Sequence, residues 1–116
     1  MAIDFPARRN ELQNLMPRLG RELPGAVGGF ANLHKSAMAD GALNAKTKEL
    51  IALGISIALR CEPCIAYHVH DALTAGATRP EILEALGVGI MMGGGPATMY
   101  ACEAFAALDQ FTSEAK

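Results

Sequence analysis

Apolar side chains recur at intervals of three and four residues along most of the chain, which is the spacing of one face of an α-helix. No segment alternates between apolar and polar residues over a useful length, so no β-strand is expected. The pattern predicts an all-α fold of about six helices. The expected helices cover residues 8–19, about 24–40, 45–59, a stretch that starts between 61 and 64 and ends at 76, 79–91, and 97–111.

Capping residues and glycines mark the expected helix ends. Gly20 should end the first helix, and Asn44 can cap the third. Thr78 and Glu81 form a capping box that opens the fifth helix, and the Gly-Gly-Gly-Pro run at 93–96 must interrupt the pattern. The third helix is apolar on nearly all sides, which predicts a central, buried helix.

Composition indicates one small domain that covers residues 1–116 and associates with copies of itself. Hydrophobic residues make up 51% of the chain and charged residues only 19%. The chain has 12 Gly but only 4 Phe, 2 Tyr and no Trp, so few bulky aromatic side chains are available to fill a core. The simplest place for the surplus apolar surface is a subunit interface, and we expect a homo-oligomer.

Charge and hydropathy exclude several classes of partner. The formal charge is −2 and no basic cluster appears, so nucleic-acid binding is not expected. Residues 1–24 lack the continuous apolar core of a targeting signal, and the apolar run at 50–59 is too short to span a bilayer. We therefore expect a cytoplasmic protein without a membrane partner. Three cysteines in such a protein favour a catalytic or metal role for the close pair over a structural disulfide.

The strongest chemical signal is the segment 60–68, Arg-Cys-Glu-Pro-Cys-Ile-Ala-Tyr-His. Cys61, Cys64 and His68 can line one stripe of a helix. Because Pro63 is tolerated only in the first turn of a helix, the helix should start between the cysteines and place Cys64 in its first turn. Free backbone N–H groups and the helix dipole favour a thiolate there, which predicts a redox site.

Glu49 can reach this site only if the chain reverses near residues 60–61. In one continuous helix Glu49 would lie ~18 Å from Cys61. In an antiparallel helix pair, Glu49 lies ~17 Å from the bend and His68 lies ~10 Å from it, so their side chains could meet. Glu49 would then orient His68, His68 would accept the proton of Cys64, Cys64 would attack, and Cys61 would resolve.

Glu49, Cys61-x-x-Cys64 and His68, in a small helical chain rich in glycine and alanine, resemble the alkyl hydroperoxide reductase D-like (AhpD-like) branch of the carboxymuconolactone decarboxylase superfamily. The resemblance covers about residues 25–110. It implies an all-helical subunit that assembles into trimers or hexamers, and an enzyme, a thiol-dependent peroxidase.

The same resemblance implies roles for individual residues. Cys64 matches the residue that attacks a hydroperoxide, Cys61 matches the residue that closes the disulfide, and Glu49 and His68 match the proton relay. A dithiol partner, such as a lipoyl-bearing protein or a small thiol, would reduce the disulfide again. No metal or other cofactor is implied beyond the redox-active cysteine pair.

One departure from this branch keeps alternatives open. Its best-known peroxidases have a histidine where this chain has Pro63, which bears on peroxidase efficiency and on the reductant. A decarboxylase or lactone-processing enzyme could use His68 and Glu49 as acid and base, although the decarboxylase branch lacks the cysteine pair. A non-enzymatic redox-sensing oligomer is the third alternative.

The remaining polar and sulfur-bearing residues are assigned simpler roles. Cys102 lies in an alanine-rich helical run and is expected to be a small buried residue. A structural zinc site would need Cys102 with His34 or His70 to complete four ligands. His70 is expected at the surface, His34 as a satisfied or interface histidine, and Tyr67 in a pocket wall or an interface.

Overall fold

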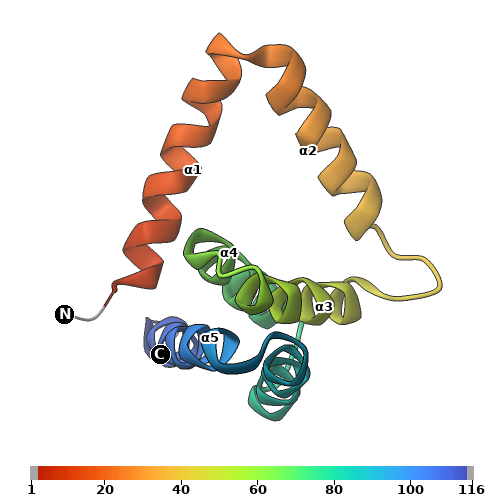
Figure 1. Cartoon of the computed structure of the whole chain (residues 1–116). Coiled ribbons are helices and arrows are strands. Elements are labelled where there is room, and N and C mark those ends of the chain that lie inside the picture. Colours follow the sequence, from red (N-terminus) through yellow and green to blue (C-terminus); the bar gives the residue numbers. More distant parts are fainter. Residues whose placement is uncertain (1–2, 115–116) are drawn as a thin grey trace.

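The structure, a computed structural model, describes residues 3–114 and contains no strand in that range. The predicted all-α fold is confirmed. Figure 1 shows the helices in chain order. They are α1 (Phe5–Glu22), α2 (Pro24–Met38), α3 (Ala45–Ala58), α4 (Glu62–Thr74) and α5 (Arg79–Glu114).

The helix count differs from the expected six because the last two run together as α5. Gly94 has φ 72° and ψ −150°, so its backbone is non-helical and α5 is kinked there. The predicted interruption at 93–96 is therefore present: the kink at Gly94 divides α5 into two helical segments. Two predicted caps are confirmed: the Asn44 side chain accepts from the Thr47 N–H at 2.8 Å, and Thr78 N–H donates to Glu81 Oε1 at 2.8 Å.

The first helix is longer than expected, and Gly20 does not end it. The Asp4 carboxylate caps it by accepting from the Ala7 N–H at 3.0 Å. A Cβ at Gly20 would lie 3.3 Å from Val27 Cγ1, so this glycine lets α1 and α2 approach closely. Phe5 is buried at the other end, and its N–H donates to Gln110 Oε1 at 2.8 Å, which fixes the start of α1 to α5.

The core lies between α3, α4 and α5. The largest fully buried side chains are those of Phe5, Leu53, Ile57, Ile65, Val69, Ile82 and Leu108. A Cβ at Gly89 would lie 2.7 Å from Ile57 Cδ1 and 2.8 Å from the Gly54 carbonyl oxygen. Glycine at this position therefore allows α5 to pack directly against α3.

In contrast, α1 and α2 form an arm that stands out from the core, with an open angle between them (Figure 1). No residue of α2 is buried. The predicted burial of α3 holds on one side only: Glu49, Leu53 and Ile57 face inward, while Ile51 is 46% exposed and Ile55 is 51% exposed. An apolar helix surface therefore remains uncovered in the single chain.

One stretch, Arg79–Ser113, is long and apolar enough to cross a membrane by length and composition alone. Gly94 interrupts it. Ile82 and Leu108 from this stretch are fully buried in the core, which accounts for part of its apolar composition.

Candidate active site

The chain reverses direction between α3 and α4, as expected. Arg60 has φ 59°, the left-handed conformation that turns a chain sharply after a helix. The Cys61 N–H donates to the Ser56 carbonyl oxygen at 3.0 Å and closes the turn. The two helices therefore run antiparallel, and residues near the start of α3 can meet residues late in α4.

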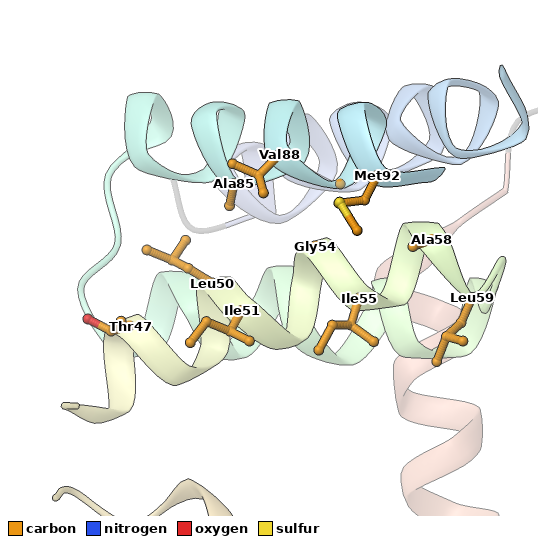
Figure 2. A pocket seen from close by; sticks show the side chains of 11 residues that line it. Thr47, Leu50, Ile51, Gly54, Ile55, Ala58, Leu59, Ala85, Val88 and Met92 are labelled. Carbon is orange, nitrogen blue, oxygen red and sulfur yellow. The ribbon is translucent and has the colours of Figure 1, made fainter. Parts of the chain in front are cut away.

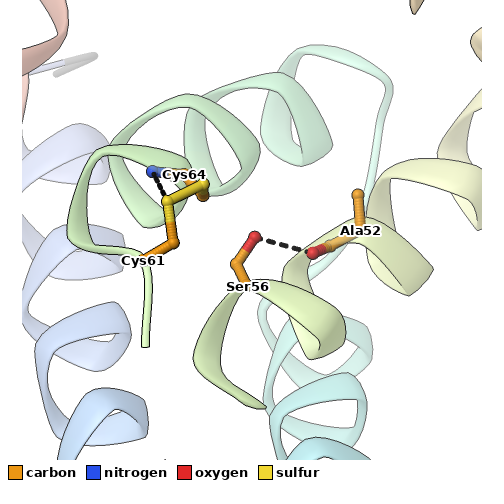
Figure 3. Close-up of a disulfide and its surroundings, with 4 residues drawn as sticks. All are labelled: Ala52, Ser56, Cys61 and Cys64. Carbon is orange, nitrogen blue, oxygen red and sulfur yellow. Dashed lines mark hydrogen bonds between the residues drawn. A yellow bond between two sulfur atoms is a disulfide. The ribbon is translucent and has the colours of Figure 1, made fainter. Parts of the chain in front are cut away.

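Cys61 and Cys64 form a disulfide at the start of α4, with their Cα atoms 5.2 Å apart (Figure 3). Cys61 is the N-cap residue, and its sulfur accepts from the Cys64 N–H at 3.3 Å. Pro63 lies within the first turn, so the predicted helix start between the cysteines is confirmed. This position exposes Cys64 to the positive end of the helix dipole and to N–H groups without helical partners, which favour a thiolate after reduction.

Glu49 and His68 meet across the antiparallel pair. Glu49 Oε2 lies 2.8 Å from His68 Nδ1, and Glu49 is only 7% exposed. Because an ionised carboxylate can only accept, Nδ1 carries the proton of this bond. The neutral ring then has its lone pair on Nε2. The predicted contact is present, and His68 lies one helical turn after Cys64 on the same face of α4.

Ser56 is a buried polar residue that the sequence analysis did not select. It lies on the turn of α3 next to the cysteine pair (Figure 3). Its hydroxyl donates to the Ala52 carbonyl oxygen at 2.7 Å within α3. The hydroxyl is therefore already satisfied by its own helix, and it needs no role in the chemistry.

Two arginines of α1 hold the outer side of α4. Arg8 Nε donates to Glu62 Oε1 at 3.0 Å, and Glu62 is one of the two residues between the cysteines. The Arg9 guanidinium lies over the ring of Tyr67, 5.7 Å from its centroid, and 3.9 Å from Asp71 Oδ1. These contacts join residues about sixty positions apart, so no local spacing could have predicted them.

Glu103 of α5 adds a second carboxyl near Glu62. Burial raises the pKa of Glu103, and the negative charge of Glu62 raises it further. Its Oε2 atom is inaccessible to solvent and has no hydrogen-bond partner among the described residues. The surroundings therefore make the charged form of Glu103 less favourable than that of a carboxylate in water.

The other candidate residues take no part in the disulfide or in the Glu49–His68 hydrogen bond. Cys102 is exposed, so its predicted burial is wrong: it lies on the outward side of α5. His70 is half-buried, with Nδ1 2.9 Å from Asp71 Oδ1 and its ring against Phe111. His34 is on the exposed helix α2, next to Phe30.

Three potential metal ligands also lie close together in this region. Within the part of the chain that the structure describes, the side chains of Glu49, His68 and Asp71 bring three ligand atoms within 4.8 Å of one another. Two of these atoms already share the Glu49–His68 hydrogen bond. No cysteine belongs to this set, so among the described residues it does not match the cysteine-based zinc site.

Comparison with known proteins gives consistent matches. The sequence model of the carboxymuconolactone decarboxylase family matches residues 24–107. An uncharacterised protein of Cupriavidus necator is 38% identical over 109 residues, which is 94% of this chain and 96% of that protein.

Two solved structures have the same fold. A carboxymuconolactone decarboxylase family protein from Legionella pneumophila has a TM-score of 0.88 at 40% identity, with 92% of this chain and 96% of that chain covered. A family protein from Thermotoga maritima has a TM-score of 0.73 at 31% identity, with 84% and 90% covered. The chain belongs to the carboxymuconolactone decarboxylase family.

Proposed function

We propose that the protein is a thiol-dependent peroxidase of the alkylhydroperoxidase type. The Cys64 thiolate attacks the terminal oxygen of a hydroperoxide, the O–O bond breaks, and the alcohol leaves after taking up a proton. Cys64 becomes a sulfenic acid. The Cys61 sulfur then attacks Cys64, water leaves, and the disulfide forms. A dithiol donor returns two electrons and two protons.

The observation that carries this proposal is the position of the cysteine pair relative to the Glu49–His68 hydrogen bond. The pair can close a disulfide at a helix N-terminus, where a thiolate is favoured. One turn later His68 is oriented by a buried carboxylate, and its Nε2 atom is available to accept the thiol proton directly or through a water.

One of the similar proteins supports the same assignment. The Thermotoga maritima relative is described as a candidate participant in an antioxidative response. The electron donor we propose is a dithiol, such as a lipoyl-bearing protein, or a small thiol, because the Cys61–Cys64 disulfide is reduced by exchange with two thiols. The proposal includes a cytoplasmic location and assembly into a trimer or hexamer.

The test is mass analysis of the reduced protein before and after one equivalent of hydroperoxide, with free thiols alkylated. The expected result is the loss of two hydrogens, mapped to a Cys61–Cys64 bridge, while Cys102 is still alkylated. Cys64→Ser should abolish peroxide consumption, and Cys61→Ser should leave Cys64 as a sulfenic acid or a mixed disulfide.

Cys102→Ser is the matched control, because it removes a thiol that is exposed and takes no part in the disulfide. It should leave disulfide formation unchanged. Three alkylatable thiols after exposure to peroxide, or full activity in Cys64→Ser, would overturn the proposal. Peroxide-independent turnover that survives loss of both cysteines would point instead to acid–base chemistry by His68 and Glu49.

A further inference from the structure

An apolar groove runs along the side of α3 that faces away from α4. It lies between α3 and the first half of α5 and encloses about 470 Å³ (Figure 2). Ile51, Ile55 and Leu59 line it from α3, and Val88 and Met92 line it from α5. No charged residue lines the groove, and Met92 is 74% exposed. The groove is therefore an uncovered apolar surface.

Helix α2 is an equally uncovered apolar element. It has 15 residues, of which none is buried, and Phe30 and Leu33 are 58% and 63% exposed. Helices of ~12–15 residues are marginal in water without tertiary packing. Gly28 and Gly29 weaken α2 further, and a Cβ on either would meet nothing within 4 Å. Something outside the single chain must therefore cover α2.

The chain exposes more surface than a compact monomer of its mass. The surface of the chain measures 7088 Å². A compact monomer of 12.2 kDa would expose about 6,100 Å². The surplus of about 1,000 Å² is at least the ~800 Å² that one chain buries in one standard interface, and the helix and the groove give each chain two faces on which to bury it.

We propose that α2 of a second copy of this chain lies in the α3–α5 groove. Each copy offers one uncovered helix and one uncovered groove, which fits a one-to-one contact. Both surfaces are nearly free of charge, since Lys35 is the one Lys, Arg, Asp or Glu in α2 and none lines the groove. No residue of α2 lines the groove of its own chain.

The contact is heterologous, because a helix of one copy meets a groove of the next, and such a contact builds a closed ring when the rotation between copies closes. The glycines of α2 would let its backbone approach the groove closely. The inference does not depend on the dithiol chemistry, since it rests on α2 and on the side of α3 that faces away from Glu49.

The experiment is native mass spectrometry of the full chain with Leu33→Glu, with Ile55→Lys, and with both changes together. Both residues are exposed in the single chain, so circular dichroism should show intact helices. Each single change places an unpaired charge in the contact and should raise the concentration for half-assembly about tenfold or more. The double variant pairs the two charges and should recover most of the assembly.

The matched control is Ser113→Glu, which adds the same charge at an exposed polar position far along α5. It should assemble like the native chain. A native chain that is monomeric, or a Leu33→Glu chain that assembles normally, would overturn the proposal. A double variant no better than Ile55→Lys alone would also overturn it, because the charges at positions 33 and 55 would then not meet across one contact.

Discussion

The Glu49–His68 hydrogen bond gives the sharpest test of the proposed chemistry. In Glu49→Gln, the amide oxygen can still accept from Nδ1 of His68, but the negative charge is lost. The native bond is 2.8 Å long, and Glu49 is only 7% exposed. A hydrogen bond to a charged group contributes about 1.5–3 kcal/mol. If that energy stabilises proton transfer to His68, disulfide formation should slow about 10- to 100-fold.

The assay is the rate at which the reduced protein forms the Cys61–Cys64 disulfide after one equivalent of hydroperoxide, quenched by alkylation and read by mass. Glu84→Gln is the matched control, because it makes the same chemical change at an exposed position of α5. The control should react at the native rate. A Glu49→Gln rate within twofold of native, with native helicity and thermal midpoint, would refute a role for Glu49 in proton transfer.

Two further predictions concern stability. Gly89→Ala should destabilise the protein by about 1–3 kcal/mol in urea unfolding, because the new methyl group would lie 2.7 Å from Ile57 Cδ1. Gly87→Ala, where a Cβ meets nothing within 4 Å, should instead stabilise by about 0.5–1 kcal/mol, and equal effects would contradict the close packing of α3 and α5. Hydrogen bonds from Lys46 and Thr78 lower the pKa of Glu81 to about 2. The stabilisation that ionised Glu81 gives the folded state is therefore complete above pH 4.5 and is lost as the pH falls through about 2. The thermal midpoints of native and Glu81→Gln proteins should therefore converge between these pH values, and a constant difference would argue against the ion pair.

The features that the sequence predicted well depend on local signals. Asn44, Thr78 and Glu81 cap helices through residues three positions away, and Pro63 restricts where α4 can begin. The Glu49–His68 contact followed from the turn near residue 60, because a reversal at a known point fixes which residues face each other across two helices.

The features that the sequence missed depend on contacts between distant segments. Arg8 reaches Glu62, and Arg9 reaches Tyr67, only because Phe5 fixes the start of α1 near α4 and α5. Cys102 was placed on the wrong side of its helix, because an alanine-rich stretch has small apolar residues on several faces. Periodicity cannot select the buried face of such a helix.

The exposed side of α3 is the most informative difference between the prediction and the structure. An apolar helix in a small protein is expected to be buried on all sides, but one side of α3 packs on α4 and α5 and the other lines the groove with Ile51 and Ile55. A helix that packs against the core on one side and against a neighbouring copy on the other needs apolar residues on both sides. The inner side also carries Glu49, the partner of His68. In the proposed assembly, α3 therefore carries Glu49 on one side and contacts α2 of the next subunit on the other. Loss of the α2 contact should then loosen the Glu49–His68 bond and slow disulfide formation.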